Sequence, residues 1–409
     1  MKDGKPNLLL LIPNLGSGGA QRIFHQHRRF LSNDFNVVCC VFNFAGAFPG
    51  EAKDSIISLD VPAGRNFPDK ILNFFQRVRR LKKIKEDHHI DVTVSHLEGA
   101  DYVSILSHRN DRLILWIHGS KVHDQEIRGV VGWFRKRVLL PWLYRRADKI
   151  ACVSLGIASE LKPMTPRASG KIVAVQNGID IPFVQSRAKE ALPATWQSLM
   201  SKYFVVVTHC RFASQKNLRS LLHVVSGLKD VIDLKFILIG DGEQRDELVE
   251  LAEKLNIPMY RSWSNDEWSE DHRLFFPGQQ SNPFPWLRHA KVYVLTSLWE
   301  GFPLSICEAI ACGLPVVAAD CFTGPKEMLA PEIAGETTTP VKGSAGIVMP
   351  LIRESSQSSI DVWIKTIRDL ISDSDTLERY RVHANQNVTR FSSERSKRET
   401  ITVVKSVLT

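Results

Sequence analysis

The stretch SLWEGFPLSICEAIACGLPVVAADCFTGPKEML, residues 297–329, decides the fold of this chain. The run KVYVLTS (291–297), which leads into it, predicts a buried parallel strand. The following run LSICEAIACG (304–313) predicts a short helix with Pro303 at its start. Glu300 therefore lies on a loop at the carboxyl end of a strand, where open α/β sheets bind ligands.

Two glutamates, Glu300 and Glu308, stand eight residues apart across this turn. The backbone between them lies at a helix N-terminus, where partial positive charge favours a phosphate. One carboxylate on the loop and one on the helix can each hold a pair of hydroxyls. This arrangement suits a nucleotide sugar, whereas the alternative is an ordinary strand–helix unit with solvated glutamates. The residues that we expect around the phosphate are Gly301, Phe302, Pro303 and Leu304.

Length and composition favour a globular protein of two or three domains. The chain has 409 residues, of which 44% are hydrophobic and 24% are charged. No apolar run approaches the roughly eighteen residues that span a bilayer, and the apolar run 7–12 leads into a glycine loop instead of a signal-peptide cleavage site. Seven cysteines without a CxxC pair disfavour a disulfide framework or a zinc site, and they favour the reducing cytoplasm.

Strand candidates alternate with helical segments along the whole chain, which predicts α/β layers. The break between the two halves falls in residues 176–196, which are polar and without periodicity. We therefore expect two Rossmann-like, doubly wound domains, 1–183 and 184–385, facing each other across a cleft. The strand candidates are residues 7–12, 36–42, 55–60, 91–96, 113–118, 149–154, 171–176, 204–209, 234–240, 273–278, 291–297, 315–320 and 345–350.

A glycine-rich loop, LGSGGAQR (15–22), follows the first strand candidate and opens a helix. Gly16, Gly18 and Gly19 would allow the backbone to approach a phosphate or a sugar closely. The loop is not a complete G-x-G-x-x-G motif, and no acidic partner for a ribose stands at the end of the second strand candidate. A dinucleotide site is therefore disfavoured.

Two cations and a second glycine turn lie at further strand ends. Arg211 and Lys216, in HCRFASQKNL (209–218), would neutralise the charge on a departing nucleoside diphosphate, although a solvated basic loop is the alternative. Gly240 and Asp241 are expected to line a nucleotide pocket, although a plain strand–helix turn is nearly as common.

The sequence contains one D-x-D triplet of the kind that holds a divalent ion in many nucleotide-sugar enzymes. It is Asp373-Ser374-Asp375, and it lies between predicted C-terminal helices, where it is typical of a helix cap. We therefore expect a reaction that needs no metal ion and no other cofactor.

The string from Glu300 to Glu308 resembles the E-x7-E block of the retaining glycosyltransferases of family four, whose fold is called GT-B. The spacing R-x4-K from Arg211 to Lys216 also resembles this family, and the similarity is most specific in 204–330. The resemblance implies that the last helix, 386–409, crosses back to the first domain.

The resemblance also implies roles for individual residues. Glu300 would contact donor-sugar hydroxyls and support the oxocarbenium charge, and Glu308 would hold the ribose. Arg211 and Lys216 would hold the diphosphate. His118, which ends the strand candidate LILWIH, would lie beside the 6-position of the donor sugar, although a half-buried strand-end histidine is the alternative.

Three further implications concern the nucleotide base, the loop at the reacting end of the donor, and the proton of the acceptor hydroxyl. Gly278 and Gln279 would offer backbone contacts to the base, and the loop at Gly16, Gly18 and Gly19 would close over the diphosphate and the acceptor. The leaving phosphate itself would take the proton of the acceptor on the front face, so that no catalytic base is named.

The net charge of +9 concentrates in two basic stretches of the first half, 69–86 and 132–149. Each alternates basic residues with apolar residues at helical spacing, and a helix with a solvated basic face explains either one alone. Together they favour an anionic membrane surface and a lipid-diphosphate-linked glycan as acceptor. Nucleic acid is disfavoured, because nothing resembles a reading module.

The resemblance is strongest to bacterial transferases for capsule, O-antigen and exopolysaccharide. It implies transfer of a hexose or an N-acetylhexosamine from a nucleotide sugar, with UDP the expected carrier, to a membrane-associated glycan. The protein would act in the cytoplasm or at the inner face of the membrane. The alternatives are a sugar-nucleotide epimerase of the same fold and a non-catalytic scaffold subunit that binds a nucleotide sugar.

Overall fold

The computed structural model describes residues 4–16, 18–44, 55–123, 129–333, 335–353 and 356–409. The chain divides into two compact units. The first unit is Met1–Asn177 with Glu394–Thr409, and the second unit is Gly178–Ser393. Each contains a mainly parallel sheet between helices, so the predicted class of two doubly wound α/β domains is confirmed. We describe each unit by itself.

The first unit is built on a seven-stranded parallel sheet, with strand order β3-β2-β1-β4-β5-β6-β7. The central strands are almost fully buried, as is usual in parallel sheets; β1 and β5 are largely apolar, whereas β4 (VTVSH) also buries polar side chains. The strands are β1 (Asn7–Ile12), β2 (Asn36–Val41), β3 (Ile56–Ser58), β4 (Val92–His96), β5 (Arg112–Ile117), β6 (Lys149–Cys152) and β7 (Ile172–Ala174).

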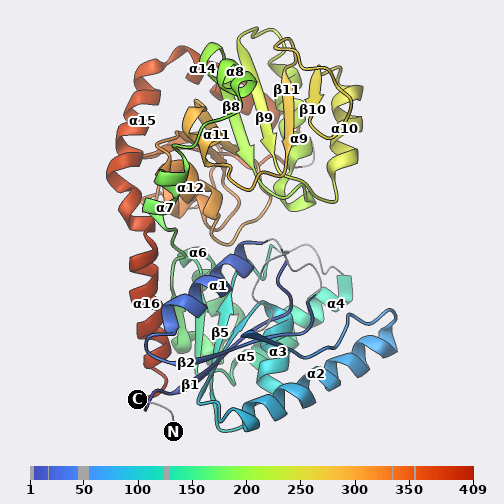
Figure 1. Cartoon of the computed structure of the whole chain (residues 1–409), viewed down its shortest axis with the longest axis vertical. Helices are drawn as coiled ribbons and strands as arrows, with labels where there is room; N and C mark the ends of the chain where they lie inside the picture. The colour runs from blue at the N-terminus through green and yellow to red at the C-terminus, as the bar shows by residue number, and fades with distance from the viewer. Residues whose placement is uncertain (1–3, 17, 45–54, 124–128, 334, 354–355) are drawn as a thin grey trace. The chain divides into compact units, whose positions relative to one another are not determined.

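The last helix of the chain, α16 (Ser393–Lys405), packs on the first unit (Figure 1). Thr400 lies 3.5 Å from the buried ring of His27, and Lys405 pairs with Asp34 at 2.6 Å. The other helices of this unit are α1 (Gly19–Leu31), α2 (Phe67–Asp87), α3 (Glu98–Leu106), α4 (Gly129–Phe134), a π-helix (Arg135–Leu139), α5 (Leu140–Tyr144), α6 (Leu155–Met164) and a 3₁₀-helix (Pro166–Lys171).

The second unit is built on an eight-stranded sheet with the order β10-β11-β9-β8-β12-β13-β15-β14. Only the pair of β14 and β15 is antiparallel among the described strand pairs. The strands are β8 (Phe204–His209), β9 (Leu234–Ile239), β10 (Met259–Arg261), β11 (Leu274–Gly278), β12 (Val292–Leu295), β13 (Val316–Ala319), β14 (Val341–Lys342) and β15 (Gly346–Met349).

The strand order of the second unit reverses between β8 and β12. From β8 the chain moves to β9 on one side, and from β12 it moves to β13 on the other side. Because crossovers between parallel strands are right-handed, the helices that follow β8 and β12 cover opposite faces of the sheet. The helices are α7 (Ile181–Arg187), α8 (Ala194–Lys202), α9 (Leu218–Gly227), α10 (Arg245–Lys254), α11 (Phe284–His289), α12 (Leu304–Ala311), α13 (Pro325–Leu329), α14 (Gln357–Ser372) and α15 (Ser374–Asn387), with 3₁₀ turns at Ser214–Lys216 and Val388–Phe391.

The junction between the units differs from the sequence-based expectation. Residues 176–196 were expected to be irregular, but they include α7, which begins where the side chain of Asp180 accepts a hydrogen bond from the Phe183 amide. Helix α7 packs against α11 and α12. The boundaries between the two units fall after residues 177 and 393, whereas the boundaries expected from the sequence were after residues 183 and 385. In the described ranges, no helix is both long and apolar enough to cross a membrane.

We predict that Gly240→Ala destabilises the second unit. Gly240 follows β9 with φ of +142°, and an added Cβ would overlap the carbonyl oxygen of Cys210. The unfolding free energy in urea should fall by about 1–3 kcal/mol. The control is Gly170→Ala, because a Cβ there meets no atom within 4 Å. Equal urea midpoints for the two variants would contradict the prediction.

Candidate functional site

Two loops meet at the strand-order reversal of the second unit. Several hydrogen bonds join the loop after β8 to the loop after β12. The hydroxyl of Thr296 donates to the carbonyl of Lys216 at 3.0 Å, and the amide of Leu298 donates to the carbonyl of Gln215 at 2.8 Å. The side-chain amide of Gln215 donates to the carbonyl of Trp299 at 2.6 Å. The sequence-predicted cation loop and glutamate loop are therefore held together.

Glu300 and Lys216 form an ion pair between these two loops. The Lys216 Nζ lies 2.6 Å from Glu300 Oε1, and the Ser297 hydroxyl donates to the same oxygen at 2.7 Å. Burial disfavours the charge on Lys216, but the Glu300 carboxylate outweighs it, so the pKa of Lys216 lies above its ordinary value. The Thr323 hydroxyl donates to the carbonyl of Glu300. The loop thus holds a fixed carboxylate beside a fixed cation.

Glu308 projects from α12, and its side chain is 1% exposed. Its Oε2 lies 2.7 Å from Nε2 of His209, the last residue of β8. The sequence analysis did not identify His209 as a site residue. It is the first residue of the segment that contains Arg211 and Lys216, but nothing in the local sequence marks it as a partner for a glutamate 99 positions away.

The residues between the two glutamates lie where the sequence placed them. Helix α12 starts at Leu304, with Pro303 at the N-cap position. The residues Gly301, Phe302, Pro303 and Leu304 are buried. No side chain caps the start of α12, so its first backbone amides are oriented for an anion.

Arg211 is not drawn into the ion pair. Its side chain is more than half exposed, and its Nε lies 3.9 Å from the carboxylate of Glu243. Arg211 and Lys216 lie at the two ends of the loop after β8. Of these two predicted cations, Lys216 is fixed in an ion pair and Arg211 is solvated.

The two glycine turns that were assigned to the nucleotide meet each other. The Gly240 amide donates to the Gly278 carbonyl at 3.0 Å. The side chain of Asp241 accepts from the Gly242 amide at 2.8 Å, and Gln279 is exposed. These turns form the rim of the sheet at the ends of β9 and β11.

The sequence analysis also missed Trp263, which follows β10 at this rim. Its side chain is 37% exposed, and the guanidinium of Arg245 lies 5.4 Å from the ring centre. An added Cβ on Gly278 would lie 3.9 Å from the ring. An exposed aromatic ring beside a predicted base contact is therefore available for stacking.

In the first unit, the glycine loop connects β1 with α1. The Gly16 amide and the Gln21 side chain both donate to Asn14 Oδ1, at 3.2 and 3.0 Å. Gly18 is the N-cap of α1, and Gly19 is its first residue. Ser17 lies outside the described residues.

His118 directly follows β5 and contacts a second histidine. Its Nε2 lies 2.8 Å from Nδ1 of His96, at the end of β4. Burial, reinforced by the charge of Lys121, lowers the pKa of His118 to about 3. The imidazole is therefore neutral at physiological pH and carries only one ring proton.

A buried charge cluster lies beside His118. Glu98, at the start of α3, accepts hydrogen bonds from Tyr102, Arg135 and Lys121, the last at 2.9 Å. Burial alone would raise the pKa of Glu98, but Lys121 and Arg135 outweigh it and lower the pKa to about 2. The sequence analysis assigned no role to these residues.

We predict that Glu98→Gln changes the acid stability of the chain. Because the folded-state pKa is below the ordinary value of 4.5, the carboxylate contributes stability above this pH, which is lost as the pH falls towards about 2. Urea unfolding should show a deficit for the variant on the order of 3 kcal/mol at pH 7, shrinking steadily below pH 4.5. The control is Asp87→Asn, because Asp87 is exposed. A stability deficit of Glu98→Gln that stays constant with pH would contradict the prediction.

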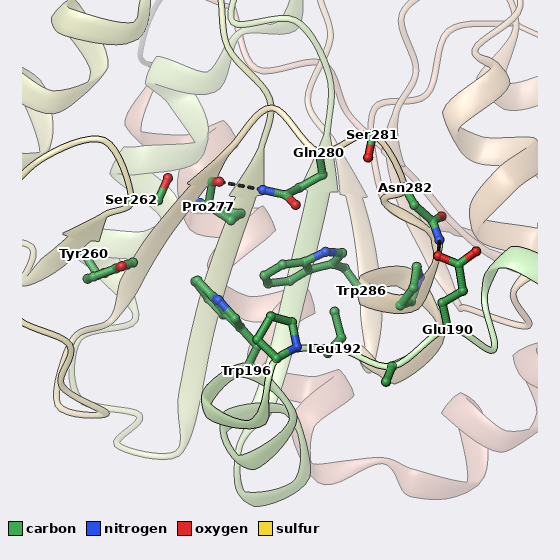
Figure 2. Close-up of a pocket in the computed structure, with 13 residues that line it drawn as sticks. Glu190, Leu192, Trp196, Tyr260, Ser262, Pro277, Gln280, Ser281, Asn282 and Trp286 are labelled. Carbon is green, nitrogen blue, oxygen red and sulfur yellow. Dashed lines mark hydrogen bonds between the residues drawn. The ribbon is translucent and has the colours of Figure 1, made fainter.

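A separate pocket of about 330 Å³ lies in the second unit (Figure 2). Trp196, Tyr260 and Trp286 line it together with Gln280 and Asn282. The two tryptophan rings meet edge to face, with centroids 4.5 Å apart. None of the sequence-predicted site residues lines this pocket, so it is distinct from the crevice at β8 and β12.

The described residues contain no group of three histidine, cysteine, aspartate or glutamate side chains that could hold a metal ion. In the D-x-D triplet, Asp373 caps α15, because its side chain accepts a hydrogen bond from the Thr376 amide at 2.9 Å. The triplet therefore has the structural role that the sequence predicted.

The fold defines a two-unit α/β protein with a largely buried lysine–glutamate ion pair at the strand ends of its second unit. The family model of glycosyl transferases group 1 matches residues 196–345, and the model of glycosyltransferase family 4 matches residues 17–182. The chain belongs to the glycosyltransferases of family four, as the sequence motifs suggested.

Several relatives span most of the chain. An uncharacterized glycosyltransferase of Methanocaldococcus jannaschii is 28% identical over 77% of this chain and 78% of its own length. The N-acetylgalactosamine-N,N'-diacetylbacillosaminyl-diphospho-undecaprenol 4-alpha-N-acetylgalactosaminyltransferase of Campylobacter jejuni is 24% identical over 78% of this chain and 82% of its own length. A UDP-Gal:alpha-D-GlcNAc-diphosphoundecaprenol alpha-1,3-galactosyltransferase of Escherichia coli is 25% identical over 74% and 76%.

Solved structures agree on the fold. A glycosyltransferase from Rickettsia africae superposes with a TM-score of 0.73 at 16% identity and covers 99% of both chains. HepE from Anabaena in complex with UDP superposes with a TM-score of 0.71 at 17% identity and covers 98% of this chain and all of its own. The fold is therefore GT-B, as expected.

Proposed function

We propose that this glycosyltransferase is a retaining, metal-independent enzyme of cell-surface polysaccharide synthesis. It transfers a hexose or an N-acetylhexosamine from a UDP-linked donor to a membrane-associated glycan at the cytoplasmic side of the membrane. The observation that carries the proposal is the crevice at β8 and β12, where Lys216 is fixed against Glu300 and Glu308 lies on the following helix.

The second unit supplies the groups that bind the donor. Glu300 receives the donor-sugar hydroxyls and supports positive charge at the anomeric carbon, and Glu308 receives the ribose hydroxyls. Lys216 and the more exposed side chain of Arg211 hold the diphosphate, aided by the start of α12. The base lies at the rim residues Gly240, Asp241, Gly278 and Gln279.

The first unit supplies His118 and the glycine loop at Gly16, Gly18 and Gly19. A neutral His118 donates or accepts a single hydrogen bond at the sugar, which suits a hydroxyl better than a phosphate. The net positive charge of the cluster formed by Glu98, Lys121 and Arg135 favours an anionic acceptor nearby.

In the proposed reaction the bond between the anomeric carbon and the diphosphate oxygen breaks while the acceptor hydroxyl attacks the same face. The proton of that hydroxyl passes to the leaving phosphate oxygen. Lys216 and Arg211 offset the charge that builds on the diphosphate, so no protein base and no metal ion are needed.

The names of two relatives support the donor and acceptor classes. The Escherichia coli relative is named for UDP-Gal and a diphosphoundecaprenol acceptor, and the Campylobacter jejuni relative is named for a diphospho-undecaprenol acceptor. A structural neighbour was solved with UDP. By the same chemistry, we expect this chain to take UDP and a lipid-diphosphate-linked glycan.

Exposed apolar side chains on the first unit support contact with an anionic membrane. The first half of α2 exposes Phe67, Ile71, Leu72 and Phe75, whereas Leu81 in its second half is buried. Basic side chains follow on the same helix. They are Arg79, Lys82 and Lys83, all exposed. A second exposed group is Val130, Val131, Trp133, Phe134, Val138 and Trp142.

We predict that UDP binds this protein without a divalent ion. At a concentration about a hundred times its dissociation constant, UDP should raise the melting temperature by roughly 5 °C. EDTA should not reduce the shift, whereas ADP and GDP should give smaller shifts. A shift that disappears with EDTA would overturn metal independence, and the absence of any nucleotide shift would overturn the transferase proposal.

Glu300→Gln is the matched variant for this measurement, because it keeps the shape of the side chain and removes its charge. UDP should still raise the melting temperature of the variant, since Glu300 is assigned to the sugar. Donor consumption with a lipid-diphosphate-linked acceptor should fall by at least about a hundredfold. Unchanged turnover would remove Glu300 from the reaction.

We predict that Leu72→Ser and Phe75→Ser together weaken binding to vesicles of phosphatidylglycerol by about tenfold or more, because each buried apolar side chain contributes about 1.5–3 kcal/mol. The control is Ile232→Ser, which removes an even more exposed apolar side chain from the second unit. Co-sedimentation measures the binding. Equal binding by both variants, or equal binding to phosphatidylcholine vesicles, would contradict an anionic docking surface on α2.

A further inference from the structure

The contact between His209 and Glu308 joins the two elements that flank the strand-order reversal. His209 is the last residue of β8, and Glu308 lies on α12, which follows β12. Nε2 of the imidazole lies 2.7 Å from Oε2 of the carboxylate. Because a carboxylate only accepts hydrogen bonds, the imidazole carries a proton on Nε2.

The imidazole is held rigidly. Its residue pairs with Ile239 in the neighbouring strand, and its ring meets the edge of the Tyr293 ring with centroids 5.7 Å apart. The Tyr293 hydroxyl also donates to the His209 carbonyl, at 3.4 Å. Its Nδ1 is buried and has no hydrogen-bond partner among the described residues. Among the described residues, the ring therefore makes one hydrogen bond, and its partner is Glu308.

Glu308 depends on this contact more than an exposed glutamate would. Its side chain is 1% exposed, and burying a carboxylate is costly unless hydrogen bonds compensate for the lost water. A glutamate on a helix also has several rotamers, of which only some direct the carboxylate to the strand ends. The imidazole on β8 is a fixed hydrogen-bond donor, and it selects one of these rotamers.

We propose that His209 is a positioning residue that orients Glu308 towards the two ribose hydroxyls of the nucleotide. The inference rests on the proposed function, in which Glu308 binds the ribose. The imidazole donates to Oε2 of the carboxylate, and the carboxylate oriented in this way accepts hydrogen bonds from the vicinal 2′- and 3′-hydroxyls. His209 itself does not contact the nucleotide.

The test uses the full chain and two probes, UDP and 2′,3′-dideoxy-UDP, with affinity measured by calorimetry. His209→Ala should weaken UDP by about tenfold or more, because Glu308 loses its orientation. It should change the affinity for 2′,3′-dideoxy-UDP by less than about twofold, because this probe lacks the hydroxyls that Glu308 holds. Equal losses for both probes would overturn the proposal.

Two conservative variants separate positioning from folding. In His209→Gln the side-chain amide can donate from near the original Nε2, whereas in His209→Asn the amide lies near the original Nδ1 and is too short to reach Glu308. His209→Gln should therefore recover most of the UDP affinity and His209→Asn should not. Equal UDP affinities for the two would contradict the proposal, even if His209→Ala fails to fold.

The wild-type chain distinguishes this inference from the function on which it rests. If wild type does not bind UDP, the proposed function fails, and the inference fails with it. If wild type binds UDP and discriminates against 2′,3′-dideoxy-UDP, but His209→Ala keeps the same discrimination, only the inference is overturned.

Discussion

The reversal of strand order between β8 and β12 is the constraint on which the rest of the second unit depends. Right-handed crossovers send α9 to one face and α12 to the other, so the loops after β8 and β12 leave the same edge of the sheet towards opposite faces. The sequence then supplies the charges, because Lys216 stands on one loop and Glu300 on the other.

Both glutamates of the candidate site have partners within the chain. Glu300 is held by Lys216 and Ser297, and Glu308 is held by His209. Pre-formed pairs offset the desolvation that a buried carboxylate would otherwise suffer, and they fix its direction. In the proposed function a diphosphate competes with Glu300 for Lys216, so donor binding exchanges one charge contact for another and leaves Glu300 free for the sugar.

The strands could be predicted because parallel strands buried on both faces are continuous apolar runs, and β1 and β8 match their predicted ranges. The short edge strands β10 and β14 were missed, since three and two residues carry no pattern. The basic stretch 132–149 is helical only as far as Tyr144, and a π-helical segment (Arg135–Leu139) lies just before Pro141, which cannot donate to the helical ladder.

The residues of the candidate site were also predictable only where a local sequence segment marks them. Glu300 and Glu308 were found because one local segment carries both, together with the helix start that lies between them. His209, His96 and Glu98 were missed because their roles arise from contacts between elements that are far apart in the sequence. A parallel sheet makes such contacts inevitable, since every strand ends at the same edge while its sequence neighbours lie a whole crossover away. Partners of a motif in this fold are therefore to be sought at the last residue of adjacent strands, whatever their distance along the chain.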